Sequence, residues 1–124
     1  MANERDDTMA KTTAARSRNY MRRLGYTAEV VEHRIGSFMR VDLFGVADVL
    51  AYKPGEGIIL IQAYRDSKST KRRHSHMNSE YKHIKLWLQS GGRFQHHVWK
   101  KTTKHGIPRW KVEVKEITAK SAAP

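Results

Sequence analysis

The chain of 124 residues contains no cysteine. This absence excludes a disulfide framework, catalysis by a thiolate and the cysteine-containing zinc sites. It suits an intracellular protein, and we expect a cytoplasmic location. Long apolar runs are also missing, and the first ten residues, MANERDDTMA, are polar and charged, unlike a signal peptide. The sequence therefore predicts no membrane-spanning segment.

Acidic residues are few. Twelve Asp and Glu stand against 24 Lys and Arg, which gives a formal net charge of +12. Such an excess usually indicates a polyanionic partner, most often nucleic acid and less often an anionic membrane surface. A basic protein with no such partner is the remaining alternative. Because many of the positive charges cluster along the chain, we favour nucleic acid.

The length fits one domain with a single sheet and a few helices. We predict an ordered domain over residues 11–118 between two frayed tails, 1–10 and 119–124. The fold class is α/β, with a mixed central sheet flanked by helices and elements in the order αβββαββ. The predicted elements are a helix over 12–24, strands over 26–35, 46–52 and 58–64, a helix around 77–88, and two edge strands in GRFQHHVWKK and PRWKVEVKEI.

Two apolar segments, 46–52 and 58–64, flank the turn KPGEG, and each is interrupted by a polar residue, Asp48 or Gln62. In an antiparallel hairpin centred on Gly55, these two residues lie opposite each other and point to the same face. An unpartnered buried carboxylate is costly, so a cation should lie nearby. One carboxylate and one amide oxygen can hold Mg²⁺ together with water and a substrate phosphate. The alternative is a hydrogen-bonded Asp48 and a satisfied core amide at Gln62.

The segments DLFGVAD and ILIQAY resemble the PD-(D/E)XK nuclease superfamily. Within it, they are most similar to the small Holliday-junction-resolvase-like and VRR-NUC-like nucleases, including phage-encoded members. The resemblance implies a restriction-endonuclease-like fold and a homodimeric, Mg²⁺-dependent DNA endonuclease, with Mn²⁺ as the alternative ion and no small-molecule cofactor. It further implies that Asp48 is the metal-binding aspartate, that Gln62 takes the second metal position, and that Ala63 offers its backbone carbonyl to the ion.

The motif departs from the family pattern at three positions. Ala47 replaces its proline, Gln62 stands where Glu is commoner, and Tyr64 occupies the position of the catalytic lysine. Because tyrosine cannot supply a positive charge, we expect Lys68, or a cation of residues 71–73, to take that role. The departures leave a second hypothesis open, in which the chain is a nucleic-acid-binding module on a degenerate nuclease fold without catalysis.

Other acidic residues and a histidine pair are further candidate ligands. Asp42 is the best additional acidic ligand or supporting group, although a solvent-exposed loop aspartate is an equal alternative. Glu32 is a weaker candidate that we expect on an exposed strand. The adjacent His96 and His97 should point to opposite faces of a strand, so we do not expect them to share a metal ion.

Two basic clusters are candidate nucleic-acid-binding surfaces, because cations hold the phosphates that flank a scissile bond. A solvated face is the usual alternative for such a charge run. The clusters are Arg16, Arg18, Arg22 and Arg23 on the first helix, and Lys68, Lys71, Arg72 and Arg73 in the connector SKSTKRRHSH.

Overall fold

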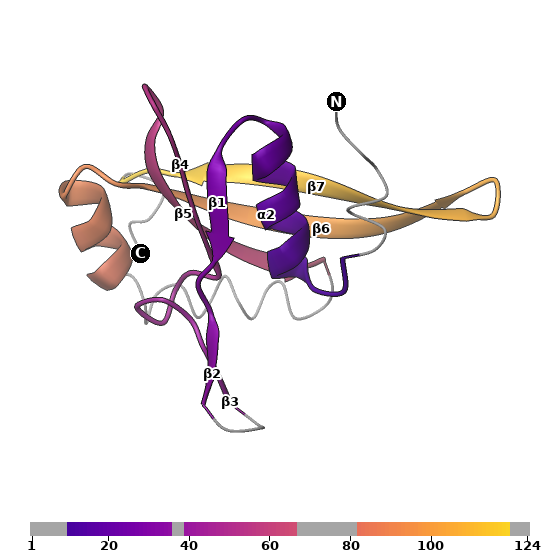
Figure 1. Cartoon of the computed structure of the whole chain (residues 1–124), viewed down its shortest axis with the longest axis horizontal. Helices are drawn as coiled ribbons and strands as arrows, with labels where there is room; N and C mark the ends of the chain where they lie inside the picture. Colours follow the sequence, from indigo (N-terminus) through magenta and orange to yellow (C-terminus); the bar gives the residue numbers. More distant parts are fainter. Residues whose placement is uncertain (1–9, 36–38, 67–81, 120–124) are drawn as a thin grey trace.

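The computed structural model describes residues 10–35, 39–66 and 82–119 (Figure 1). Within these ranges a five-stranded mixed sheet has the order β1-β4-β5-β6-β7, in which β5 and β6 are parallel and the other neighbours antiparallel. Its strands are β1 (Thr27–Val30), β4 (Val49–Lys53), β5 (Gly57–Arg65), β6 (Arg93–Lys104) and β7 (Ile107–Ile117). The predicted α/β class with a mixed central sheet is confirmed.

Helix α2 (Thr13–Arg23) begins and ends at clear sequence signals. Thr12 has an extended backbone, and its Oγ1 accepts the N–H of Ala15 at 3.1 Å, which caps the first turn. At the other end Gly25 adopts φ of 93°, a left-handed conformation that glycine tolerates best. The structure confirms the predicted helix to within one residue at each end.

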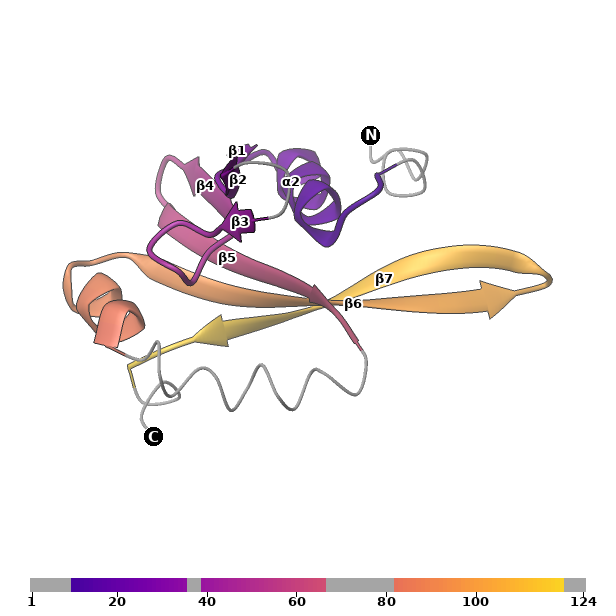
Figure 2. The same ribbon diagram turned by 90° about the horizontal axis from the view of Figure 1, so that it is seen from below.

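Two hydrophobic clusters cover opposite faces of the sheet. Figure 2 shows α2 on one side of the sheet and the helical residues 82–89, in orange, on the other. Side chains alternate along β5, so Ile59 and Ile61 face α2 while Leu60 faces away from it. The cluster under α2 contains Ala14, Met21, Ala28, Val49, Ala51, Ile59 and Ile61. The other contains Val46, Ala47, Leu60, Ile84, Phe94 and Ile117. Ile84 belongs to the helical residues 82–89, so a helix contributes to each face, as predicted.

The central hairpin has the predicted register. Leu50 pairs with Leu60 and Val49 with Ile61, which are the residues equidistant from Gly55. Gly55 and Gly57 take φ of 84° and 77° in and beside the turn, where residues with a side chain would be strained. The position of a turn between two apolar segments was therefore enough to fix this pairing.

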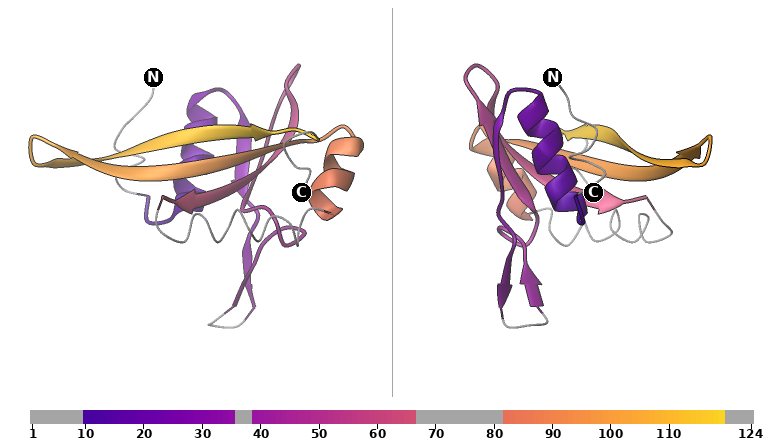
Figure 3. Two further views of the ribbon diagram at one scale, coloured as in Figure 1. Left: turned by 180° about the vertical axis from the view of Figure 1, so that it is seen from behind. Right: turned by 45° about the vertical axis from the view of Figure 1, so that its right-hand side comes forward.

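The prediction of one continuous strand over residues 26–35 is wrong. The chain forms β1, leaves the sheet, and then forms β2 (His33–Ile35), which pairs with β3 (Met39–Val41) in a separate two-stranded hairpin (Figures 1 and 3). The break occurs where Val31 donates its N–H to the carbonyl of Asp48 at 2.8 Å. The described elements therefore include two short strands more than the predicted αβββαββ order.

Strand β6 was predicted at an edge of the sheet but lies inside it, between β5 and β7. Its polar residues suggested exposure, yet Gln95, His96 and His97 are buried. Burial of Gln95 and His97 is tolerated because their polar atoms are bonded: His97 Nδ1 lies 2.9 Å from Ser17 Oγ, and His97 Nε2 lies 2.9 Å from Gln95 Oε1. The contact between Ser17 and His97 joins residues 80 positions apart, so it cannot be recognised from the local pattern.

Replacing Ser17 by alanine should lower the free energy of unfolding by about 1–3 kcal/mol. Ser17 is fully buried, and its Oγ accepts the indole N–H of Trp99 at 2.8 Å and contacts His97 Nδ1, so the change leaves two buried polar groups short of a partner. Urea denaturation measures the effect. Ser90→Ala, which removes an exposed hydroxyl bonded to the Leu86 carbonyl, is the matched control. Equal losses in the two variants would contradict this account of Ser17.

Several predictions concern residues beyond the described ranges. The tails fall almost wholly outside them, as do Lys68, Lys71, Arg72 and Arg73 of the connector. The helix predicted around 77–88 is seen as helical from 82 to 89. None of the helices in the described part of the chain has the length and apolar character that crossing a bilayer requires.

Candidate metal centre

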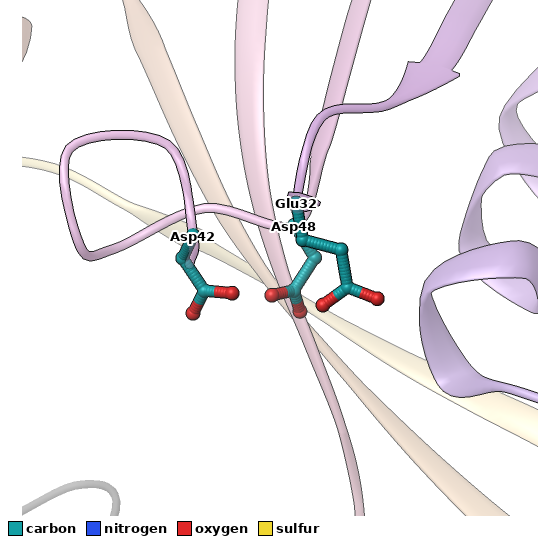
Figure 4. Close-up of side chains that lie close together, drawn as sticks. All are labelled: Glu32, Asp42 and Asp48. Carbon is teal, nitrogen blue, oxygen red and sulfur yellow. The ribbon is translucent and has the colours of Figure 1, made fainter. Parts of the chain in front are cut away.

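Three carboxylates gather beside the sheet from three separate segments (Figure 4). Glu32 follows β1, Asp42 follows β3, and Asp48 directly precedes β4. One ligand oxygen of each lies within 4.8 Å of the others. Carboxylate oxygens in this arrangement are the ligands that a hard divalent cation prefers.

A tight loop brings Asp42 beside Asp48. Leu43 and Ala47 form an isolated antiparallel bridge, and the N–H of Gly45 bonds the carbonyl of Asp42 at 3.0 Å. Phe44 and Gly45 have φ of 56° and 74°, so the chain reverses within a few residues. Six positions apart in the sequence, the two aspartates therefore become neighbours in space.

Asp48 is held by hydrogen bonds on both sides. Its Oδ2 accepts the N–H of Ala63 at 2.8 Å, and its own N–H donates to the carbonyl of Ile61 at 2.8 Å. Its carbonyl accepts the N–H of Val31, which places the neighbouring Glu32 in the cluster. Only 5% of Asp48 is exposed. The side chain is therefore fixed in orientation rather than free in solvent.

Burial and neighbouring negative charge raise the pKa of Asp48 to about 8. Desolvation is the largest cause, followed by the charge of Asp42; a hydrogen bond with Asp42 and the charge of Glu32 act in the same direction, while the bond from Ala63 opposes them. Near neutral pH the cluster thus keeps a proton on Asp48. A divalent cation at these oxygens would replace that proton, because it stabilises the ionised form.

A pocket of about 270 Å³ opens at the cluster. It is lined by Thr12, Thr13, Ala14, Glu32, Asp42, Asp48 and Ala63. The first turn of α2 thus faces the three carboxylates, and Thr13 donates its Oγ1–H to the carbonyl of Ala63 at 3.3 Å. The backbone N–H groups of a first helical turn lack intrahelical partners and favour negative charge. This pocket combines acidic ligands with an anion-favouring helix end.

The structure brings Asp48, Asp42 and Ala63 together but does not bring Gln62 to them. Gln62 is buried, is not among the residues that line the pocket, and by alternation shares the Leu60 face of β5. The predicted convergence assumed that the strand pairing continues to Asp48. Instead Asp48 occupies a bend before β4, and its carboxylate turns to the N–H of Ala63.

Tyr64 stands where the PD-(D/E)XK pattern has its lysine, and it is likewise not among the residues that line the pocket. It is 3% exposed, and its hydroxyl lies 3.1 Å from His96 Nδ1. His97, which follows His96, instead contacts Ser17 of α2, so the two histidines face opposite sides of the sheet as predicted. Lys68, which was predicted to supply the missing charge, lies outside the described residues.

Glu32 was predicted to be a weak candidate on an exposed strand, and this expectation about its surroundings is wrong. It lies in the break between β1 and β2, is partly buried, and lines the pocket. No local sequence signal indicates it, because Val31 and Glu32 continue a strand-like segment that contains no glycine or proline.

The arginines of α2 have different surroundings. Arg16 is only 8% exposed, and its guanidinium lies 4.0 Å from the ring centroid of Trp110. Arg22 bonds the carbonyl of Ala28 and pairs with Glu29 at 2.9 Å. Arg18 and Arg23 remain partly exposed. The cluster predicted to bind nucleic acid therefore includes one buried cation and one that is ion-paired within the chain.

Comparison with known proteins does not assign a function to this site. No family model, no curated protein and no solved structure matches the chain. The functional interpretation depends on the three carboxylates, their pocket and the charge of the molecule.

Proposed function

We propose that the chain is a divalent-cation-dependent DNA endonuclease of the PD-(D/E)XK type that hydrolyses phosphodiester bonds inside the cell. The observation that carries the proposal is the meeting of Glu32, Asp42 and Asp48 within 4.8 Å in a pocket that Ala63 of the adjacent strand also lines. The net charge of +12 supports a polyanionic substrate. Preference for branched DNA and a homodimeric state are further parts of the proposal, by resemblance to the junction resolvases.

The donor set fits Mg²⁺, or Mn²⁺ in its place. Glu32, Asp42 and Asp48 would hold the ion together with the carbonyl of Ala63, since such ions take oxygen ligands and retain several waters. The raised pKa of Asp48 is the electrostatic sign that this cluster favours added positive charge. When bound, the ion would supply Lewis-acid stabilisation of the phosphodiester and a lower pKa for the attacking water.

The chain's own residues orient the carboxylates and form a wall at which a substrate phosphate could lie. Ala63 N–H fixes the orientation of the Asp48 carboxylate, and the loop after Asp42 keeps the second carboxylate beside it. The backbone N–H groups of Thr13 and Ala14 belong to the first turn of α2 at the pocket wall. A phosphate at this wall would be stabilised by the helix end.

The runner-up function is DNA binding without catalysis. It is favoured by one observation: Gln62 and Tyr64, at two of the three motif positions, do not line the pocket. In that case salt-sensitive DNA binding would need no divalent ion and would survive replacement of Asp48.

Purified protein is expected to cleave at least one member of a labelled panel of four-way junction, flap, duplex and single-stranded DNA. Cleavage should occur with Mg²⁺ or Mn²⁺ and cease in EDTA, because the carboxylates alone provide no positive charge to stabilise the transition state. Ca²⁺ in place of Mg²⁺ serves as the control for general effects of a divalent ion. If the protein binds these substrates but cleaves none of them under any condition, the nuclease function is rejected and DNA binding without catalysis remains.

A further inference from the structure

The hairpin of β6 and β7 continues beyond the sheet. Strand β5 pairs with β6 only as far as the Arg65–Trp99 pair, after which β6 has β7 as its sheet partner. Residues 100–111, called the basic arm below, form this extension, which projects past α2 at one end of the molecule (Figures 1 and 2). All of them are exposed except the half-buried Trp110.

The basic arm is a regular ribbon. Five successive residue pairs run from Lys100–Lys111 to Lys104–Ile107. His105 and Gly106 have φ of 55° and 78°, which gives the two positive values of a tight two-residue hairpin turn. At about 3.3 Å per residue, five pairs extend roughly 17 Å. The arm therefore presents its side chains in a defined arrangement.

Basic and acidic side chains occupy different parts of this hairpin. The arm contains no Asp or Glu, and its cationic side chains are Lys100, Lys101, Lys104, Arg109 and Lys111. At its base Lys100 lies 3.5 Å from Glu113 and 3.8 Å from Asp66, so acidic partners end where the arm begins. Lys100 and Lys111 are directly opposed, and Glu113 and Asp66 offset their repulsion only at this base.

Cations also gather over Trp110 at the root of the arm. The charged groups of Arg16, Arg65 and Lys101 lie 4.0, 5.1 and 5.8 Å from its ring centroid. They come from α2, the end of β5 and β6, so the arm is joined to the body by a positively charged junction. Ala63, which lines the carboxylate pocket, is only two residues before Arg65.

We propose that the basic arm docks into a groove of duplex DNA and holds the duplex beside the carboxylate pocket. The proposal rests on the nuclease function and names its substrate as double-stranded DNA. A two-stranded β-ribbon fits the major groove of B-form DNA, while the deep, narrow major groove of duplex RNA does not admit one. Cations along the ribbon contact the flanking phosphates, and Ile107 at the tip, 54% exposed, faces the base edges.

The test is duplex binding by the full chain in EDTA, which separates docking from cleavage. Lys104→Gln/Lys111→Gln removes two cations from one face of the arm, and Lys82→Gln/Lys85→Gln removes two exposed cations from the helix at the opposite end of the molecule (Figure 1). The probe is a fluorescein-labelled 30-base-pair duplex, with a single strand of equal length, an RNA duplex and anionic phosphatidylserine vesicles for comparison.

The arm variant should bind the DNA duplex at least about tenfold more weakly at ~0.1 M salt, with a salt slope reduced by about 2. The control variant should bind within about twofold of wild type, since its cations are remote from the groove. Equal losses in both variants, or equal losses on duplex and single strand, would overturn groove docking. So would an arm effect confined to RNA or to vesicles.

The outcomes distinguish this proposal from the nuclease itself. If the protein binds duplex DNA through the arm but never cleaves it, the docking proposal is supported and the nuclease function is rejected. If the protein cleaves junctions or single strands, and the arm variant binds and cleaves as wild type does, the nuclease function is supported and the docking proposal is rejected. Circular dichroism and thermal unfolding of the arm variant should match wild type, because the altered residues lie outside both hydrophobic clusters.

Discussion

Asp48→Asn should reduce DNA cleavage by about 10³-fold or more, which corresponds to about 4 kcal/mol of transition-state stabilisation. Asparagine keeps the shape of the side chain and can still accept the N–H of Ala63, so the fold is retained. It removes the negative charge that a divalent ion requires from its most buried ligand. Single-turnover cleavage of the preferred substrate at saturating protein measures the effect without a contribution from weaker DNA binding.

The matched control is Asp66→Asn, which makes the same chemical change at the end of β5. Asp66 is exposed and lies 3.8 Å from Lys100, outside the carboxylate cluster. This variant should cleave within a few-fold of wild type. If both variants retain full activity, or if both lose it equally, the carboxylate cluster is not the metal centre.

A second pair of variants separates the site in the structure from the site expected from the sequence motif. Glu32→Gln removes a carboxylate that lines the pocket, whereas Gln62→Met changes a residue on the Leu60 face of β5. The structure predicts loss of metal-dependent cleavage for Glu32→Gln and retention for Gln62→Met. If Gln62→Met loses cleavage and Glu32→Gln retains it, Gln62 rather than Glu32 is the metal ligand.

Part of this site was predictable from the sequence because it depends on local geometry. The turn at Gly55 fixed the pairing of Leu50 with Leu60, and that pairing placed Asp48 next to the strand that carries Ala63. The loop between Asp42 and Asp48 is short enough that the two carboxylates could be expected together. Short-range constraints therefore predicted two of the three clustered acids.

The remainder depends on contacts between distant segments. Glu32 joins the cluster only because Val31 bonds the carbonyl of Asp48 and the chain leaves the sheet there, with no glycine or proline to indicate it. The burial of His97 in β6 is satisfied by Ser17, which lies 80 residues away in the sequence. Arg16 likewise looks like a solvent-exposed cation until the fold places Trp110 against it. Periodicity describes one element at a time and contains no information on such pairs.

Without metal, the protein should lose stability as the pH rises from 6.5 to 8, by about 2 kcal/mol at about 1.4 kcal/mol per pH unit. The folded-state pKa of Asp48, about 8, is raised above its ordinary value of 3.8. Its protonated form therefore favours folding, and this contribution is complete below pH 3.8 and is lost as the pH rises through 8. Urea denaturation in EDTA at several pH values measures the slope.

The window begins at pH 6.5 because of His97. Burial, with a smaller effect from His96, lowers its pKa from 6.5 to about 3, so the folded state resists its protonation. Between pH 3 and 6.5 this group makes stability rise with pH and opposes the effect of Asp48. Above pH 6.5 His97 loses its proton in the unfolded chain as well, so its opposing contribution fades and the slope due to Asp48 dominates.

Asp48→Asn should abolish this slope between pH 6.5 and 8 and make the metal-free protein more stable than wild type at pH 8, because asparagine has no charge to desolvate. Saturating Mg²⁺ should abolish the slope in wild type as well, since a bound cation favours the ionised carboxylate in the folded state. Mg²⁺ should not stabilise Asp48→Asn to the same extent. An unchanged slope in the variant would mean that Asp48 is already ionised in the folded protein, and the repulsion within the carboxylate cluster would then not be the feature that selects a cation.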